Sequence, residues 1–144
     1  RKFAAVLVKR MMRLPRSIVR PAIKRLTTTF RSFSAIVVGD DDRFSDLEKK
    51  LADKKRIYYF TASWCPPCRM IGPEYEKLAK ADNGESGVHY LKLDIDDLPE
   101  AAGQYMIRSV PTFIFMNGKE RSSPDLLGAD LVKMQSNVAK LISS

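Results

Sequence analysis

After residue 34, the apolar positions of this chain show two kinds of spacing. Short runs rich in β-branched and aromatic residues indicate strands, and apolar residues three to four positions apart indicate helices. The strands expected on this basis cover residues 35–38, 56–61, 89–94 and 112–116. The expected helices cover residues 43–54, the stretch from the Cys65–Cys68 segment to residue 81, residues 98–105 and residues 131–142.

The fourth strand ends in a turn signal. Asn117-Gly118 is the strongest two-residue signal for a β-hairpin, because both residues tolerate a positive φ angle. The returning strand is weakly marked, near residues 123–127, and Pro124 suggests that it lies at an edge of the sheet. The resulting order, βαβαβαββα, predicts an α/β domain with a central mixed β-sheet and helices on both faces.

The charged residues also divide the chain after residue 34. The formal net charge is +8, but ten of the 25 Lys and Arg lie in residues 1–34, which contain no Asp or Glu. Residues 35–144 therefore carry 15 basic and 17 acidic side chains, a net charge of −2. A mildly acidic body argues against nucleic-acid binding. Since no run of 18 apolar residues is present, we expect no transmembrane helix and no stable membrane binding.

The basic segment has the character of an organellar targeting peptide. On a helical wheel, the apolar residues of positions 2–14 gather on one side and the basic residues largely on the other. An amphipathic, Arg-rich segment without acids is typical of a transit peptide. Arg31-Ser-Phe-Ser34 resembles a mitochondrial cleavage pattern and predicts a cut after Phe33.

We therefore expect a transit peptide over residues 1–33 and a mature domain over residues 34–144. The mitochondrial matrix is the expected location, and the plastid stroma is the second choice. The alternative for the basic segment is an arm that the mature protein keeps and uses.

Cys65-Pro66-Pro67-Cys68 lies between a buried strand and a helix, where a Cys-x-x-Cys sequence indicates a redox-active dithiol. With Cys65 at the N-cap, Cys68 lies one turn along the helix, so the two sulfurs can bond or separate with little backbone movement. The helix start favours a thiolate at Cys65. That thiolate attacks a substrate disulfide, and Cys68 then attacks Cys65 to release the reduced substrate.

The residues around the two cysteines narrow the chemistry. Pro66 suits the first helical position, where its missing N–H has no cost. Pro66 and Pro67 together remove two amide donors, which leaves the Cys68 amide to face the Cys65 sulfur. Two Cys and one His fall short of the four ligands of a structural zinc ion, so we expect no metal site. A purely structural disulfide over so short a loop would constrain the unfolded chain little.

The stretch from Tyr59 to Pro73, YFTASWCPPCRMIGP, resembles the thioredoxin family. Four further motifs agree at the spacing of that family, namely Lys92-Leu-Asp-Ile-Asp96, Ile107-Arg-Ser-Val-Pro-Thr112, Asn117-Gly118 and Gly128-Ala129. The similarity covers about residues 35–143. YFTA before Trp64 and LLGAD before the last helix look most like the o-type thioredoxins of plant mitochondria. The resemblance implies the thioredoxin fold and a thiol-disulfide oxidoreductase that reduces protein disulfides.

The resemblance also implies roles for residues around the dithiol. Trp64 would flank the nucleophile and shape the contact surface, although an ordinary core position is the alternative. Pro111 would follow a cis peptide bond and face the cysteines. The backbone of Val110 would pair with an extended substrate segment, and Gly128 and Ala129 would complete an apolar groove.

Two departures from the family pattern concern Pro66 and Tyr59. Pro66 replaces the usual Gly, which affects the redox potential rather than the reaction. Tyr59 stands where most members bury an acid that assists deprotonation of the resolving thiol, so Lys92, which matches the family's buried lysine, is expected to lack its acidic partner. A phenol with a pKa near 10 is a poor base at neutral pH. We expect core packing for Tyr59, with a polar role of its hydroxyl as the alternative, and deprotonation of Cys68 by Lys92, water or the substrate.

The resemblance implies a monomer without a bound cofactor, in which the dithiol is the redox centre. An NADPH-linked thioredoxin reductase would reduce it, and proteins with disulfides, such as peroxiredoxins, would be its targets. Two rivals stay open. One is glutathione-dependent, glutaredoxin-like chemistry, against which the segment around Val110 and Gly128-Ala129 argues. The other is a dimer that holds a [2Fe–2S] cluster through Cys65 of each copy, a hypothesis that only Pro66 keeps open.

Overall fold

The computed structural model describes residues 35–144, so the transit peptide expected over residues 1–33 lies outside the described part. The strands are β1 (Ile36–Val38), β2 (Lys55–Thr61), β3 (His89–Asp94), β4 (Thr112–Asn117), β5 (Glu120–Arg121) and β6 (Leu126–Leu127). The helices are α1 (Asp41–Lys50), α2 (Pro66–Asp82), α3 (Pro99–Gln104) and α4 (Leu131–Ser143). Among these helices, none is long and apolar enough to cross a membrane.

Strand β2 is the centre of the sheet. The strand order is β1-β3-β2-β4-β5, and β6 also pairs with β4. β2 runs parallel to β3 and antiparallel to β4, and every residue of β2 after Lys55 is buried. The predicted mixed sheet with a buried central strand is therefore confirmed. Because β2 and β3 are parallel, their carboxyl ends meet at one edge of the sheet, which is the edge from which α2 departs.

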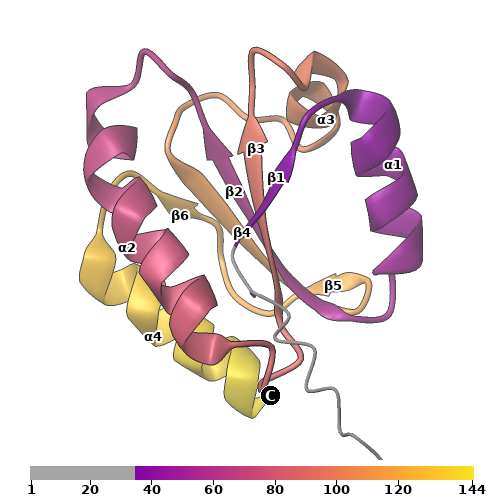
Figure 1. Cartoon of the computed structure of the whole chain (residues 1–144), viewed down its shortest axis with the longest axis vertical. Coiled ribbons are helices and arrows are strands. Elements are labelled where there is room, and N and C mark those ends of the chain that lie inside the picture. Colours follow the sequence, from indigo (N-terminus) through magenta and orange to yellow (C-terminus); the bar gives the residue numbers. More distant parts are fainter. Residues whose placement is uncertain (1–34) are drawn as a thin grey trace, which may run out of the picture.

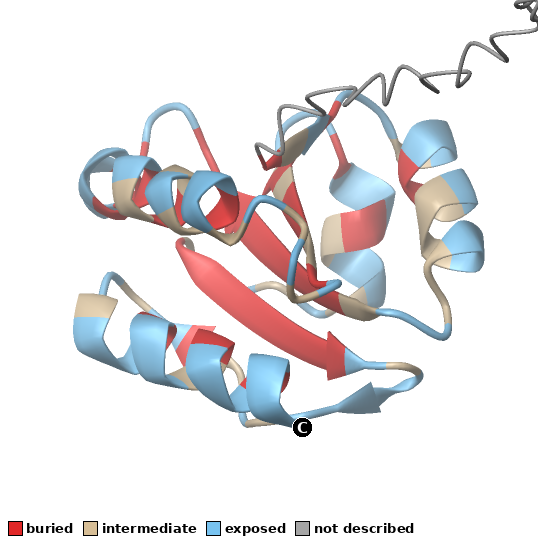
Figure 2. Ribbon diagram, turned by 60° about the horizontal axis from the view of Figure 1, so that its bottom comes forward, coloured by how far each residue is buried: buried red, intermediate tan, exposed pale blue. Residues whose placement is uncertain are grey.

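The helices form a layer on each face of the sheet. α2 and α4 cover one face, and α1 and α3 cover the other (Figure 1). Buried residues lie along the strands and on the sides of the helices that face them, while the outer sides of the helices are exposed (Figure 2). Two hydrophobic cores result, one on each face of the sheet.

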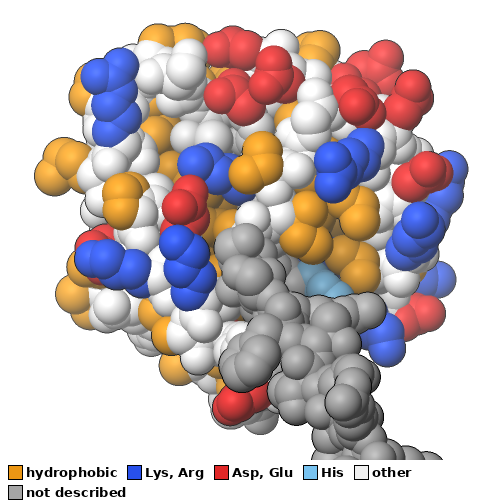
Figure 3. All heavy atoms as spheres, in the orientation of Figure 1, with side chains coloured by type: hydrophobic (Ala, Val, Ile, Leu, Met, Phe, Trp, Pro, Cys, Tyr) orange, Lys and Arg blue, Asp and Glu red, His pale blue; other side chains and the backbone are white. Residues whose placement is uncertain are grey.

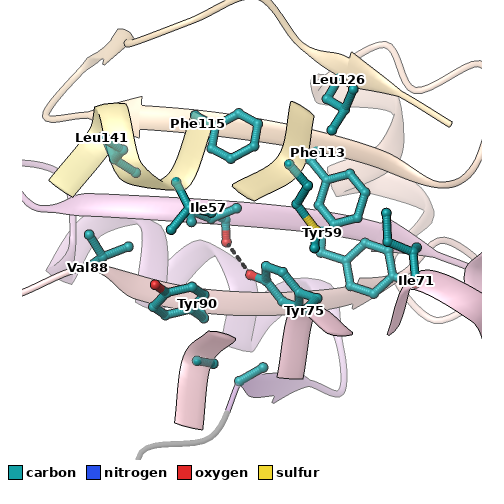
Figure 4. Close-up of a cluster of buried hydrophobic side chains, with 14 residues drawn as sticks. Ile57, Tyr59, Ile71, Tyr75, Val88, Tyr90, Phe113, Phe115, Leu126 and Leu141 are labelled. Atoms are coloured by element: carbon teal, nitrogen blue, oxygen red, sulfur yellow. Dashed lines mark hydrogen bonds between the residues drawn. The ribbon is translucent and has the colours of Figure 1, made fainter. Parts of the chain in front are cut away.

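The core under α2 and α4 ties the long helix to the sheet. The hydroxyl of Tyr75 on α2 lies 3.2 Å from the carbonyl oxygen of Ile57 (Figure 4) and 3.1 Å from that of Leu91, and shares its one hydrogen between them. Since Ile57 belongs to β2 and Leu91 to β3, one buried side chain fixes α2 across two neighbouring strands. The position of the amino end of α2 relative to the strand ends is set in this way.

Two elements differ from the sequence-based expectations by more than one residue. α1 begins two residues earlier and ends four residues earlier than expected, because the Asp40 carboxylate caps it by accepting the Arg43 N–H at 2.7 Å. At the other end of α1, the buried guanidinium of Arg56 donates to the carbonyl oxygen of Leu51 at 2.9 Å. This carbonyl therefore has a hydrogen-bond partner although the helix does not continue. The single returning strand expected near residues 123–127 is instead two short strands, β5 and β6, and Pro124 lies between them.

Candidate active site

The amino end of α2 holds both cysteines. Cys65 is the N-cap, and its sulfur accepts the N–H of Cys68 at 3.2 Å. Pro66 begins the helix and, like Pro67, is exposed. Cys65 and Cys68 form a disulfide with a Cα–Cα distance of 5.3 Å, and both residues are buried. The predicted N-cap position of Cys65 is therefore confirmed, and the only amide that the two prolines leave near the sulfur does point at it.

The loop before β4 covers the Cys65 side of the disulfide. The Val110–Pro111 peptide bond is cis, as the resemblance implied, and the Val110 carbonyl oxygen lies 3.5 Å from the Cys65 sulfur. Gly128 donates its N–H to the Pro111 carbonyl at 2.8 Å, with a φ of +85° that favours glycine. Ala129 follows and is exposed. The structure thus brings the predicted groove residues from two distant loops together beside Cys65.

Trp64 lies on the surface beside the disulfide. It is 59% exposed, so the alternative of a core tryptophan is wrong. Its indole Nε1 donates to the Asp96 carboxylate at 2.9 Å. Asp96, Asp97 and Glu100 are all exposed, and acidic side chains gather along the edge of the molecule from which α1 and α3 start (Figure 3). Asp96, to which the sequence analysis assigned no role of its own, therefore fixes the orientation of the indole.

Tyr59 combines the two roles that the sequence left open. The side chain is fully buried, and its ring stacks on Phe113 with centroids 4.6 Å apart (Figure 4). Its hydroxyl donates to the Cys68 carbonyl oxygen at 3.1 Å. Burial raises the pKa of the phenol above its ordinary value of 10, which makes it a still weaker base at neutral pH. Tyr59 therefore supports the first turn of α2 by packing and by one hydrogen bond.

Lys92 does have an acidic partner, contrary to the expectation from the sequence. Lys92 pairs with Tyr59 in the register of β3 and β2, so it lies next to the phenol. Its ammonium group is 3.0 Å from a carboxylate oxygen of Glu76, which comes from α2. The side chains are 32% and 37% exposed, respectively, so the pair is half-buried rather than sealed in the core. The acid that is missing from β2 is thus replaced by one on the neighbouring helix.

A cavity of about 350 Å³ lies behind Cys68, on the side away from the cis-proline loop. Its lining includes Tyr59, Cys68, Gly72, Glu76, Lys92 and Asp94. Cys68, Gly72 and Glu76 follow one another at intervals of four, which places them on one face of α2. This spacing is visible in the sequence and is the signal from which Glu76 could have been predicted. Gly72 leaves the middle of that face without a side chain.

A disulfide at a helix start, next to an exposed Trp and a cis-proline loop, defines a thiol-disulfide exchange site. No organic cofactor is needed for this chemistry, since the dithiol itself carries the two electrons. Within residues 35–144, no group of three or more His, Cys, Asp or Glu side chains is placed to hold a metal ion.

Comparison with known proteins agrees with this class. The thioredoxin family model matches residues 35–140. A thioredoxin of Malassezia sympodialis is 33% identical over 104 residues, which cover 72% of this chain and 95% of that protein. Thioredoxin H-type 2 of Nicotiana tabacum is 41% identical over 100 residues, which cover 68% of this chain and 80% of that protein. Oxidised thioredoxin O2 of Arabidopsis thaliana superposes with a TM-score of 0.68 at 31% identity, covering 76% of this chain and 96% of that one.

The chain belongs to the thioredoxin family. It is a thiol-disulfide oxidoreductase that reduces protein disulfides through the Cys65/Cys68 dithiol. Neither glutaredoxin-like chemistry nor a cluster-binding dimer is favoured by these similarities. Thioredoxins in general need no bound cofactor, act on proteins with disulfides and are reduced by thioredoxin reductase.

The packing of Tyr59 predicts the result of restoring an acid at this position. Tyr59→Asp should lower the free energy of unfolding by about 3–5 kcal/mol, because it removes a stacked ring and places a carboxylate in its buried site. Tyr59→Phe is the matched control and should cost only about 1 kcal/mol, the contribution of one hydrogen bond. Urea unfolding of the two variants and the wild type measures both values. Equal losses for the two variants would contradict the importance of the ring.

Proposed function

We propose that this chain reduces target proteins in the mitochondrial matrix, with Cys65 as the attacking thiolate and Cys68 as the resolving thiol. We further propose that it acts as a monomer and takes its electrons from an NADPH-linked thioredoxin reductase. The observation that supports these roles most directly is the helix start. Cys65 occupies the N-cap, where the Cys68 N–H and the helix dipole favour negative charge on its sulfur.

The proposed reaction has two exchange steps. The Cys65 thiolate attacks one sulfur of the target disulfide, forms a mixed disulfide and releases the other target sulfur as a thiolate, which takes up a proton. Cys68 then loses its proton and attacks the Cys65 sulfur, so the Cys65–Cys68 disulfide forms and the second target thiol leaves. Two electrons pass from the dithiol to the target. The reductase would return two electrons from NADPH to the disulfide.

Target binding would use the groove beside Cys65. An extended segment of the target would pair with the backbone of Val110 next to the cis-Pro111. Gly128 and Ala129 would line the groove on one side, and the exposed indole of Trp64 would add apolar contact. Peroxiredoxins, whose reaction cycle leaves a disulfide, are the class of target that we propose first.

The proposed location rests on residues 1–33, which precede the described domain. Residues 1–34 contain ten Lys and Arg and no Asp or Glu, a composition that fits an import signal. The mildly acidic domain that follows has no such basic segment. We therefore propose a transit peptide that ends at Phe33 and a thioredoxin domain over residues 34–144. The plastid stroma stays the second choice.

A coupled assay tests the source of electrons. With NADPH and thioredoxin reductase, the wild-type protein should reduce insulin and consume NADPH at a rate proportional to its concentration. Glutathione with glutathione reductase should support less than about one tenth of that rate, because the chain belongs to the thioredoxin family, whose members are reduced by thioredoxin reductase. The Cys65→Ser variant is the negative control. Comparable rates with the two reductants would contradict the proposal.

Trapping distinguishes the roles of the two cysteines. Cys68→Ser should accumulate mixed disulfides with target proteins, because the attack by Cys65 still occurs and the resolving thiol is gone. Cys65→Ser should accumulate none above background. Non-reducing gels with and without dithiothreitol, followed by mass spectrometry of the released proteins, provide the measurement. Stable adducts of Cys65→Ser alone would reverse the assignment.

Import assays test the targeting segment. The full chain should enter isolated mitochondria, become protease-protected and emerge with Ser34 as its first residue, whereas a chain starting at Ser34 should stay outside. Isolated chloroplasts serve as the comparison. Protected protein that still contains residue 3, or efficient import into chloroplasts alone, would contradict the proposed processing and location, respectively.

A further inference from the structure

We propose that Glu76 accepts the proton of the Cys68 thiol, through water in the cavity behind the disulfide, when the mixed disulfide is resolved. The inference rests on the proposed roles of Cys65 and Cys68. It assigns to a residue of α2 a function that neither the sequence motif nor the similarity to known thioredoxins identifies.

The resolving step needs a proton acceptor. Only the thiolate of Cys68 attacks the Cys65 sulfur, so the S–H bond of Cys68 must break before or as the new S–S bond forms. The proton goes to the acceptor, the electron pair of the Cys68 sulfur forms the bond to Cys65, and the target sulfur leaves with the electron pair of the mixed disulfide. The acceptor then returns the proton to solvent or to the departing thiolate.

The cavity joins the two residues. Cys68 and Glu76 line the same space of about 350 Å³, and Gly72 between them has no side chain to divide it. Eight residues of α-helix rise about 12 Å, so direct transfer from sulfur to carboxylate is too far and a water chain is required. A cavity of this size has room for several water molecules, and its lining includes the charged side chains of Arg69, Glu76, Lys92 and Asp94 as hydrogen-bond partners.

The other ionisable groups that line the cavity are less suited than Glu76 to accept the Cys68 proton. They are Arg69 from α2, Tyr59 from β2, and Lys92 and Asp94 from β3. Arg69 and Lys92 are cations, and Tyr59 already donates its hydroxyl hydrogen to the Cys68 carbonyl. Asp94 accepts the N–H of Asp96 at 3.0 Å, which holds its carboxylate in the turn after β3. Of the two carboxylates that line the cavity, Glu76 is the one whose hydrogen-bond partner is a cation.

The ion pair suits Glu76 to this task. Lys92 lies 3.0 Å from one carboxylate oxygen, so the Glu76 side chain is held on the cavity side of α2. The second carboxylate oxygen accepts no hydrogen bond from the other residues of 35–144, which leaves it to accept one from water. Because both partners are about one third exposed, a proton received from the cavity has a short route to bulk solvent.

Ellman's reagent separates the two steps in a stopped-flow experiment on the reduced full chain. Attack by Cys65 releases one thionitrobenzoate at a rate proportional to reagent concentration, and resolution by Cys68 releases the second at a rate independent of it. Glu76→Gln should slow the second phase about tenfold or more at pH 7 and leave the first unchanged. The deficit should shrink as the pH rises towards 9, because hydroxide then takes the proton.

Glu74→Gln is the matched control. Glu74 lies on the same helix with a side chain 36% exposed, and it is paired with Lys77 at 2.6 Å, but it does not line the cavity. Its second phase should equal that of the wild type. Glu76→Asp, which keeps a carboxylate, should recover most of the lost rate. Circular dichroism and melting temperatures establish that every variant is folded.

Several outcomes would overturn the inference. They are an unchanged or faster second phase in folded Glu76→Gln, an equal deficit in Glu74→Gln, and no recovery in Glu76→Asp. A slow second phase in Asp94→Asn together with a normal one in Glu76→Gln would assign the proton to Asp94 instead. Absence of the first phase from the wild type would show that the proposed attack by Cys65 had failed, an outcome distinct from any change confined to the second phase.

Discussion

The hydrogen bond from the Cys68 N–H to the Cys65 sulfur is the interaction on which the site depends. It forms where the buried strand β2 passes into α2, and it makes one sulfur the cap of the helix whose first turn contains the other. The disulfide, its position under the Val110 carbonyl and the partial positive charge near Cys65 all follow from this junction. Tyr75 and Tyr59 keep the junction in place, because their hydroxyls bond to the strand carbonyls and to Cys68, respectively.

Tyr59 occupies the core position on β2 where the family buries a carboxylate, and Glu76 supplies a carboxylate from α2 instead. A carboxylate in the middle of β2 would lose its hydration, whereas a stacked phenol adds apolar contact there. A carboxylate on α2 keeps part of its hydration and gains an ammonium partner from β3. Tyr59 thus contributes core packing and Glu76 accepts the proton, and both side chains line the cavity beside Gly72.

Local sequence patterns predicted the strands, the mixed sheet and the capped start of α2, because each of these features depends on residues that are near one another in the chain. The end of α1 was placed too late because Arg56, which comes from the next strand, occupies the Leu51 carbonyl. Trp64 with Asp96 and Lys92 with Glu76 were missed for the same reason, since each pair joins elements that meet only in the fold. In the family pattern, the acidic partner of the buried lysine stands at the position of Tyr59 on β2. Because Tyr59 is not an acid, the sequence predicted that Lys92 has no acidic partner.

The disulfide has two sides with different environments, and this separation has a chemical consequence. The Cys65 side meets the cis-proline loop and the exposed Trp64, where we propose that the target binds. The Cys68 side opens onto a cavity that contains charged groups and reaches solvent beside Glu76. A bound target therefore need not block the route by which the Cys68 proton leaves. Because different residues line the two sides, we expect substitutions in the loops to change target affinity and substitutions on the cavity face of α2 to change the rate of resolution.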